Sequence, residues 1–199
     1  EILVINNHST DHTEEVLKEL GVTYFNEYRK GPGFARQCGL NHARGKYHLC
    51  IDADTLYPPQ YISTMIKVLQ DKEVAGAYAL WSFLPNEHLY LKIQNLNRPE
   101  LNVRGMAFAF HTETARKEGF RTDILRGEDG SLALALKKYG KLRFVTARKA
   151  RVLTGYGTIS ADGSLFSSFK KRAIKGLRSF TTLFYSKNNY EDEDSNLIK

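Results

Sequence analysis

The 199-residue chain has the length of one domain with at most an appendage. Its 42% hydrophobic and 26% charged residues argue against a disordered chain, a collagen-like repeat or a membrane bundle. The formal net charge of +7 indicates affinity for anionic partners such as nucleotide phosphates, acidic lipid or nucleic acid. Cys38 and Cys50 provide neither a disulfide framework nor a paired zinc-site spacing. We interpret them as reduced thiols, which predicts a cytoplasmic protein.

The N-terminal 25 residues predict a strand, a helix and a second strand. Residues 1–6 are a continuous apolar, β-branched run, which is typical of a strand buried on both faces of a parallel sheet. An apolar helix face follows and ends at Gly21, and residues 22–25 predict the second strand. Such a strand–helix–strand unit is the building block of an open α/β sheet.

The same alternation continues along the chain. We expect residues 84–99 to form a loop with a short helix, because their pattern is irregular. The remaining predicted elements are helices over 34–44, 58–69 and 128–139, and strands over 47–51, 74–81, 106–110, 142–145 and 151–153.

Two carboxylates, Asp52 and Asp54, stand where a predicted buried strand ends. Ligands of open α/β sheets bind beyond the carboxyl ends of the strands. Neighbouring acids repel each other, and a hard divalent cation with oxygen ligands relieves that repulsion. Such a cation would bridge the acids to a diphosphate and neutralise charge on a leaving group. The alternative is that this segment is a turn capping the following helix.

Several motifs form a longer ordered pattern. The N-terminal ones are EILVINNHSTD at 1–11, KGPGFARQCG at 30–39, ARG at 43–45 and IDAD at 51–54. The later ones are Gly105 before MAFAF, Gly119-Phe120, and GED at 127–129 before a helix that ends at Gly140. In this order they resemble the donor and acceptor halves of family 2 glycosyltransferases, from residue 1 to about residue 153. The resemblance implies a GT-A fold, which is an α/β, Rossmann-type, open and mostly parallel sheet flanked by helices.

The resemblance also implies roles for individual residues. Asp52 and Asp54, with Ala53 between them, would hold Mn²⁺ or Mg²⁺ on the diphosphate of a nucleotide-sugar. Asp129 would be the general base on the acceptor hydroxyl, and Glu128 would help to position the acceptor. The other implied contacts are Asn6, Asn7 and Ser9 in the nucleoside pocket, Gly31, Gly33 and Arg36 along the nucleotide, and Gly105 on the acceptor side.

Simpler readings of these residues stay open. Glu128 and Asp129 would also suit a solvated helix start, where acids meet the positive end of the helix dipole. Gly31 and Gly33 would also suit a plain turn. Asn6 departs from the family's usual Asp, and an amide both donates and accepts hydrogen bonds. The strand that usually precedes residue 1 is absent from this sequence. Neighbouring strands would then have unpaired backbone groups, unless a longer polypeptide or another chain fills the gap.

Beyond Gly155, apolar residues recur every three or four positions over 165–184, with Lys and Arg mostly on the other faces. This pattern predicts a basic amphipathic helix, followed by an acidic tail at 191–194. The helix would either contact an anionic membrane peripherally, at the inner face, or pack its apolar stripe on the domain.

We therefore expect a catalytic domain over 1–155, with a nucleotide-sugar-binding half at 1–82 and an acceptor half at 83–155. Residues 156–199 would carry the amphipathic helix and the acidic tail. The expected function is metal-dependent, inverting transfer of a sugar to a glycan, polysaccharide or lipid-linked acceptor, with no nucleic-acid partner. The alternatives are a non-catalytic basic protein that binds membrane or nucleotide on the same scaffold, and a sugar nucleotidyltransferase.

Overall fold

The computed structural model describes residues 1–83, 103–124 and 126–154. These residues belong to one compact unit, Glu1–Thr154. The predicted loop at 84–99 and the predicted C-terminal helix lie outside the described residues, so the domain boundary at 155 stays a prediction. Among the helices that are described, none has the length and apolar character needed to cross a membrane.

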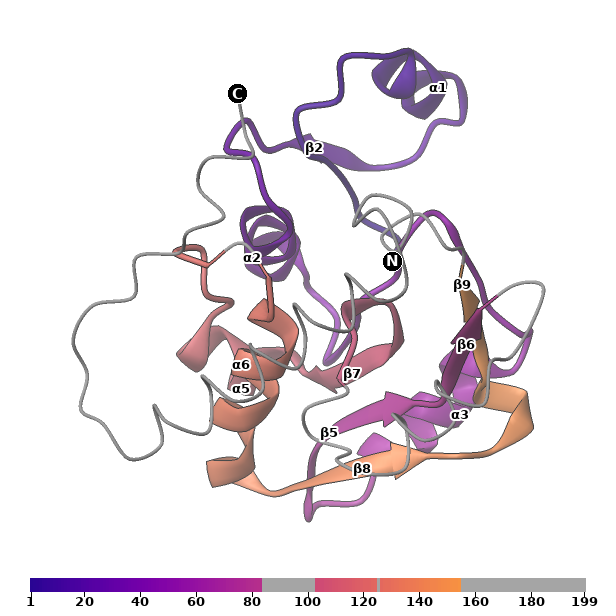
Figure 1. The fold of residues 1–199 in the computed structure, drawn as a ribbon, viewed down its shortest axis with the longest axis vertical. Helices are drawn as coiled ribbons and strands as arrows, with labels where there is room; N and C mark the ends of the chain where they lie inside the picture. The colour runs from indigo at the N-terminus through magenta and orange to yellow at the C-terminus, as the bar shows by residue number, and fades with distance from the viewer. Residues whose placement is uncertain (84–102, 125, 155–199) are drawn as a thin grey trace, which may run out of the picture. The chain divides into compact units, whose positions relative to one another are not determined.

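The N-terminal elements form the predicted strand–helix–strand unit. Strand β1 (Val4–Asn6) pairs in parallel with β2 (Tyr24–Asn26), and helix α1 (Thr13–Glu19) connects them (Figure 1). The register places Asn6 opposite Asn26, where both strands end. Helix α2 (Pro32–His42) then packs against β1. This arrangement gathers the polar carboxyl ends of β1 and β2 at one edge.

The central sheet has the strand order β3-β7-β5-β8. Its strands are β3 (Tyr47–Leu49), β5 (Val74–Ala79), β7 (Phe108–His111) and β8 (Lys141–Val145). Strand β7 is antiparallel to both of its neighbours, whereas β5 and β8 are parallel. The start of β7 therefore lies beside the end of β3, because antiparallel neighbours run in opposite directions. This pairing brings two distant parts of the chain to the same edge.

A third sheet has the order β4-β9-β6, with β4 (Thr55–Leu56), β9 (Val152–Thr154) and β6 (Trp81–Phe83). The single strand predicted over 74–81 divides at Leu80, whose N–H bonds to Val145 in β8 and whose carbonyl accepts from Val152 in β9. The chain thus leaves the central sheet and enters the third sheet at Leu80.

The strand directions correct one detail of the sequence prediction. Of the strand pairs in the described residues, three are parallel and three are antiparallel, so the sheets are mixed rather than mostly parallel. The physical reason is that a buried apolar run shows that a strand is covered, but not in which direction it runs.

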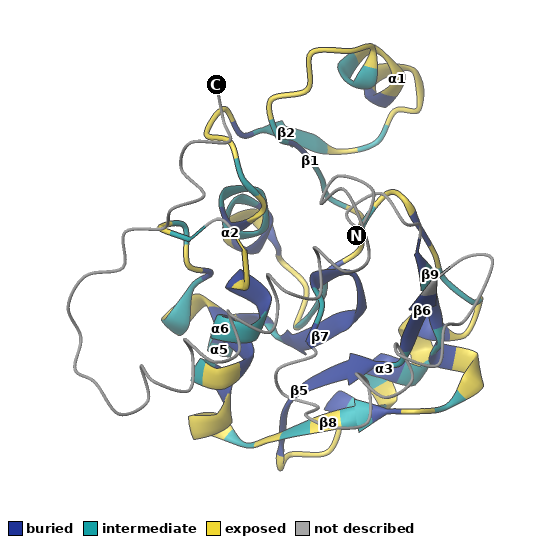
Figure 2. Ribbon diagram, viewed as in Figure 1, coloured by how far each residue is buried: buried dark blue, intermediate teal, exposed yellow. Residues whose placement is uncertain are grey.

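Strands β1 and β3 each end a sheet. One edge of each therefore pairs with no other strand in the described part of the chain. The residues of β3 are half-buried, whereas all of β5 is buried (Figure 2).

Helices cover the central sheet. Helix α3 (Tyr61–Leu69) packs on β5 and β7, while α5 (Thr112–Glu118) and α6 (Glu128–Leu136) lie side by side near β7. Helix α5 was not predicted, because it is short and polar. The described residues also contain three 3₁₀ turns: η2 (Gly105–Ala107), η3 (Lys137–Tyr139) and η4 (Arg148–Ala150). One hydrophobic cluster of buried residues consists of Leu40, Cys50, Ala75, Tyr78, Val103, Phe108, Phe110, Ala115, Phe120, Leu132, Ala133 and Leu136.

Candidate active site

The candidate site lies where β3 ends and β7 begins. The Cys50 N–H bonds to the Phe108 carbonyl at 2.9 Å, which extends the pairing by one residue. Beyond it the chain turns through Asp52, while the η2 turn leads into β7. The Tyr57 hydroxyl joins these segments, because it accepts from the Asp52 N–H at 2.9 Å and donates to the Met106 carbonyl at 2.8 Å. Burial raises the pKa of Tyr57 to about 12, so the phenol is protonated at neutral pH.

Arg36 brings the predicted acids together. Its Nη2 lies 3.2 Å from Asp52 Oδ1, its Nη1 lies 3.0 Å from Asp129 Oδ1, and the same nitrogen bonds to Glu128. The Arg36 side chain is 16% exposed. One guanidinium from α2 thus contacts carboxylates from the β3 end and from α6. Asp129 therefore faces the same side of the molecule as Asp52. Arg36, which was expected along the nucleotide, contacts these carboxylates directly.

Gly105 completes this cluster in two ways. Its N–H donates to Asp129 Oδ2 at 2.7 Å. A Cβ atom at Gly105 would overlap the guanidinium of Arg36. Because Gly105 has no side chain, the guanidinium of Arg36 has room to reach the acids. The backbone N–H of Gly105 also holds one oxygen of Asp129. We name Arg36, Asp52, Gly105, Glu128 and Asp129 the acid cluster.

The two oxygens of Asp129 have different surroundings. Oδ2 accepts the Gly105 N–H, whereas Oδ1 receives no hydrogen bond from any described residue. Oδ1 does lie 3.0 Å from Arg36 Nη1, so the contact is an ion pair whose geometry is not that of a hydrogen bond. A buried acceptor without a donor is costly. Oδ1 is therefore suited to accept a proton or a hydroxyl hydrogen from a ligand.

Burial and the surrounding charges act against each other in the acid cluster. Burial raises the pKa of Asp129, and the positive charge of Arg36 opposes that rise. Burial also raises the pKa of Asp52, with Arg36 opposing and Asp54 reinforcing the rise. For Arg36, burial disfavours the charge, but the nearby carboxylates outweigh it and raise the pKa. The guanidinium thus stays charged while it stabilises the acids around it.

Asp54 differs from Asp52 because it is exposed. The Thr55 hydroxyl donates to its Oδ1 at 3.1 Å, and the exposed Ala53 between the two acids has no side-chain donor. In the described residues no group of three His, Cys, Asp or Glu side chains could hold a metal. Carboxylate oxygens, such as those of Asp52 and Asp54, are the ligand type that a hard cation such as Mn²⁺ or Mg²⁺ takes, and diphosphate or water oxygens would have to complete its shell.

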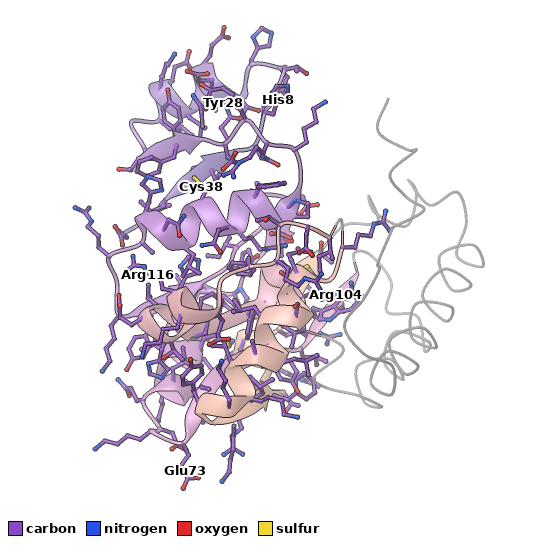
Figure 3. The ribbon with its side chains drawn as sticks, turned by 90° about the vertical axis from the view of Figure 1, so that its left-hand side faces the viewer. His8, Tyr28, Cys38, Glu73, Arg104 and Arg116 are labelled. Atoms are coloured by element: carbon purple, nitrogen blue, oxygen red, sulfur yellow. The ribbon has the colours of Figure 1, made fainter. Side chains whose placement is uncertain are left out.

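The residues predicted for the nucleoside pocket meet in two small groups. The Asn6 amide donates to Asn26 Oδ1 at 2.9 Å and accepts the Ser9 N–H at 3.2 Å. The Asn7 amide accepts the Gly31 N–H at 3.0 Å and donates to two carbonyls of the 27–29 segment. Asn7 therefore shapes the loop between β2 and α2. The exposed His8 and Tyr28 lie at this end of the unit (Figure 3).

The two loop glycines have separate structural reasons. Gly31 has φ of 131°, which other residues rarely adopt. A Cβ at Gly33 would overlap the carbonyl oxygen of Arg121 and lie 3.4 Å from its carbonyl carbon. Gly33 thus lets the start of α2 approach the 121–122 backbone. Its contact with a nucleotide stays a prediction.

Sequence reasoning missed two residues that organise the site. Asn26 pairs with Asn6, but the second strand was predicted to end one residue earlier. Tyr57 bonds to Met106, which lies 49 residues further along the chain. No local pattern marks such a contact. The nearest signal is its place between the aspartate pair and Pro58.

Comparison with known proteins identifies the class of protein that this fold and site define. The sequence profile of Glycosyl transferase family 2 matches residues 1–125. The chain therefore belongs to glycosyltransferase family 2, which confirms the resemblance inferred from its motifs.

Among curated relatives, the chain is 29% identical to the UDP-Glc:alpha-D-GlcNAc-diphosphoundecaprenol beta-1,3-glucosyltransferase WfaP of Escherichia coli, over 86% of this chain and 70% of that protein. It is 36% identical to the uncharacterized glycosyltransferase YibD of Escherichia coli (strain K12), over 42% of this chain and 26% of that protein. An uncharacterized glycosyltransferase of Rickettsia bellii is 26% identical over 48% of this chain, which spans 14% of that relative.

Solved structures confirm the predicted GT-A fold class. The mannosyltransferase PcManGT from Pyrobaculum calidifontis, in complex with GDP-Man and Mn²⁺, aligns with a TM-score of 0.64 and 24% identity. The alignment covers 88% of this chain and 55% of that one. TarS residues 1–349 from S. aureus also align with a TM-score of 0.64, at 14% identity, over 78% of this chain and 51% of that one.

Proposed function

We propose that this chain is the catalytic region of a metal-dependent, inverting glycosyltransferase. It would transfer a sugar from a nucleotide-sugar donor to a hydroxyl group of a glycan, polysaccharide or lipid-linked acceptor. The observation that carries the proposal is Asp129: one of its oxygens is held by Gly105, the other lacks a hydrogen-bond donor in the described residues, and Arg36 links it to Asp52.

In this proposal Asp129 is the general base. A sugar hydroxyl is a poor nucleophile, so Oδ1 takes its proton while the acceptor oxygen attacks the anomeric carbon. The bond to the diphosphate breaks as the new bond forms, and this single displacement inverts the anomeric centre. The Gly105 N–H orients the carboxylate through Oδ2. Burial raises the pKa of Asp129, which makes its carboxylate a stronger base.

Asp52 and Asp54 would hold the divalent cation. When bound, that cation supplies charge stabilisation for the departing nucleoside diphosphate. Arg36 supports the same region, because its guanidinium balances the carboxylates before any ligand enters. Glu128 is already paired with Arg36, so we propose that it positions the acceptor through that pair. Asn6, Asn7, Ser9, Gly31 and Gly33 would form the nucleoside side of the donor site.

The names of similar proteins support the substrate class. PcManGT was solved with GDP-Man and Mn²⁺, and TarS with UDP-GlcNAc. The name of WfaP specifies UDP-Glc and an acceptor on diphosphoundecaprenol. We therefore propose a nucleotide-sugar donor and favour a lipid-linked acceptor. A peripheral membrane contact through residues 165–184 would bring the chain to such an acceptor, and that contact stays a prediction.

The test compares Asp129→Asn with Asp123→Asn, an exposed acid paired with Arg121 at the surface. Binding is followed by the thermal shift that UDP or GDP produces with and without Mn²⁺. Transfer is followed by release of nucleoside diphosphate from UDP-glucose and GDP-mannose, with an N-acetylglucosamine-diphospholipid acceptor. We expect Asp129→Asn to keep the metal-dependent shift and to lose about 10²- to 10⁴-fold in transfer, while Asp123→Asn changes neither.

Two outcomes would contradict the proposal. Unchanged turnover in Asp129→Asn would remove the base, and nucleotide binding without turnover in the unaltered chain would favour the non-catalytic alternative. Release of pyrophosphate from a nucleoside triphosphate and a sugar phosphate would instead identify a nucleotidyltransferase.

A further inference from the structure

Tyr57 connects two backbone segments by one hydroxyl group. The phenol oxygen accepts the Asp52 N–H at 2.9 Å and donates its own hydrogen to the Met106 carbonyl at 2.8 Å. Both partners are main-chain groups. The bridge therefore sets the distance between two stretches of backbone, whatever side-chain rotamers those stretches adopt.

Each end of this bridge is one step from a proposed functional carboxylate. Asp52 itself carries one of the two proposed metal-binding carboxylates. Met106 follows Gly105, whose N–H holds Asp129 Oδ2 at 2.7 Å. The path from the donor side to the base thus runs through Tyr57, Met106 and Gly105. Arg36, from helix α2, also links the carboxylates of Asp52 and Asp129, in its case by ion pairs.

Tyr57 also has a packing role, which its ring performs without the hydroxyl group. The Tyr57 ring packs on Tyr61 with ring centroids 4.9 Å apart, so the ring alone helps to seat the start of α3. The Tyr61 hydroxyl is buried and has no hydrogen-bond partner in the described residues. Of these two neighbouring tyrosines, only Tyr57 uses its hydroxyl to bridge two backbone segments in the described residues.

We propose that Tyr57 is a positioning residue, whose hydroxyl fixes the spacing between the donor-side Asp52 loop and the Gly105 segment that holds Asp129. The inference rests on the proposed function and adds a residue to it. Without the hydroxyl, the nucleotide would still bind, because no ligand-facing carboxylate is removed. The base and the donor would no longer be held at the spacing that attack requires, and misplacement by about 1 Å can cost about 100-fold in rate.

The first experiment measures the bridge without any substrate. Amide hydrogen exchange is compared in Tyr57→Phe, in Tyr61→Phe and in the unaltered chain, over peptides that cover 50–56 and 103–108. We expect Tyr57→Phe to exchange faster in both peptides, although they are far apart in sequence, and Tyr61→Phe to change neither. Unchanged exchange in both peptides of Tyr57→Phe, or faster exchange in only one, would overturn the bridge.

The second experiment separates binding from turnover, using UDP or GDP with Mn²⁺ for binding and UDP-glucose or GDP-mannose with the diphospholipid acceptor for transfer. We expect Tyr57→Phe to lower kcat by about 10- to 100-fold, with the donor KM and the nucleotide thermal shift retained. Tyr61→Phe should match the unaltered chain. Equal kcat in the two variants would refute the positioning role. Absence of transfer in the unaltered chain would refute the proposed function and this role with it, while the exchange result would still stand.

Discussion

A single methyl group at Gly105 would collide with Arg36. An ideal Cβ at this position overlaps three atoms of the guanidinium. In Gly105→Ala, therefore, Arg36 must withdraw from Asp52 and from Asp129. The side chain is only 16% exposed and is surrounded by acids, so it cannot withdraw without leaving carboxylates unpaired. We expect this variant to lose both stability and transfer activity.

The expected loss in free energy of unfolding follows from separating Arg36 from its carboxylate partners. Removing one partner from a buried ion pair costs about 3–5 kcal/mol. Because the Arg36 tip keeps some solvent contact and can reorient, we expect about 3 kcal/mol, the lower end of that range. In a chain of this size, each kcal/mol lowers the melting temperature by about 2–4 °C. Gly105→Ala should therefore melt about 6–12 °C below the unaltered chain.

Gly130 provides the matched control. It lies in α6, next to Asp129, and a Cβ there would have no neighbour within 4 Å. Because Ala is favoured over Gly in a helix by about 1 kcal/mol, Gly130→Ala should melt at or above the unaltered chain. Thermal and urea unfolding would compare the two variants. Equal melting temperatures would refute the reasoning, as would a Gly105→Ala cost that stays undiminished when Arg36→Met removes the colliding group.

Two further predictions concern stability outside the site. Arg116 donates to the carbonyls of Leu40 and Ala43 at the end of α2, and lies against that helix end (Figure 3). Arg116→Met should therefore lower the free energy of unfolding, measured with urea, by about 1–3 kcal/mol. The control Lys67→Met, at an exposed position of α3, should leave it unchanged. Burial, helped by Arg116, lowers the pKa of His48 to about 4, so between about pH 6.5 and pH 4 the unfolded chain binds a proton that the folded chain does not. As the pH is lowered over this range, the contribution of His48 to the free energy of unfolding should therefore fall by about 1.4 kcal/mol per pH unit. His48→Phe, which keeps a ring against Phe110, should remove this contribution, and an equal pH dependence of the free energy of unfolding in both proteins would contradict the assignment.

Local patterns predicted the parts of the fold that depend on nearby residues. The apolar run before Asp52 correctly predicted a strand that ends at the site. The helical spacing of the apolar residues after Pro59 correctly predicted α3; of the five positions in that pattern (Tyr61, Ile62, Met65, Ile66 and Leu69), the structure buries Tyr61, Met65 and Leu69 and leaves Ile62 exposed. Strand direction was not predictable in this way. The reversed course of β7 depends on pairing with strands far away in sequence, and Leu80 changes sheets for the same reason.

The candidate site shows the same division. The positions of Asp52, Asp54 and Asp129 followed from motifs, and the structure brings Asp52 and Asp129 together through Arg36. The contacts of Arg36 with the acids could not be predicted, because they join Arg36 to Glu128, 92 positions further along the chain, and to the next residue, Asp129. The space at Gly105 is equally hidden from sequence reasoning, since the atom that fills it belongs to another element.

The antiparallel pairing of β3 and β7 also bears on how such a chain can diversify. The residues beside Asp52 and Gly105 belong to adjoining strands of one sheet, so backbone hydrogen bonds hold these two strand ends together next to the acid cluster. Surrounding segments can then accumulate substitutions that admit different acceptors, without altering the framework on which the carboxylates stand. New acceptor preferences would therefore arise from substitutions in the segments around the acid cluster, while the paired strands β3 and β7 beside it are retained.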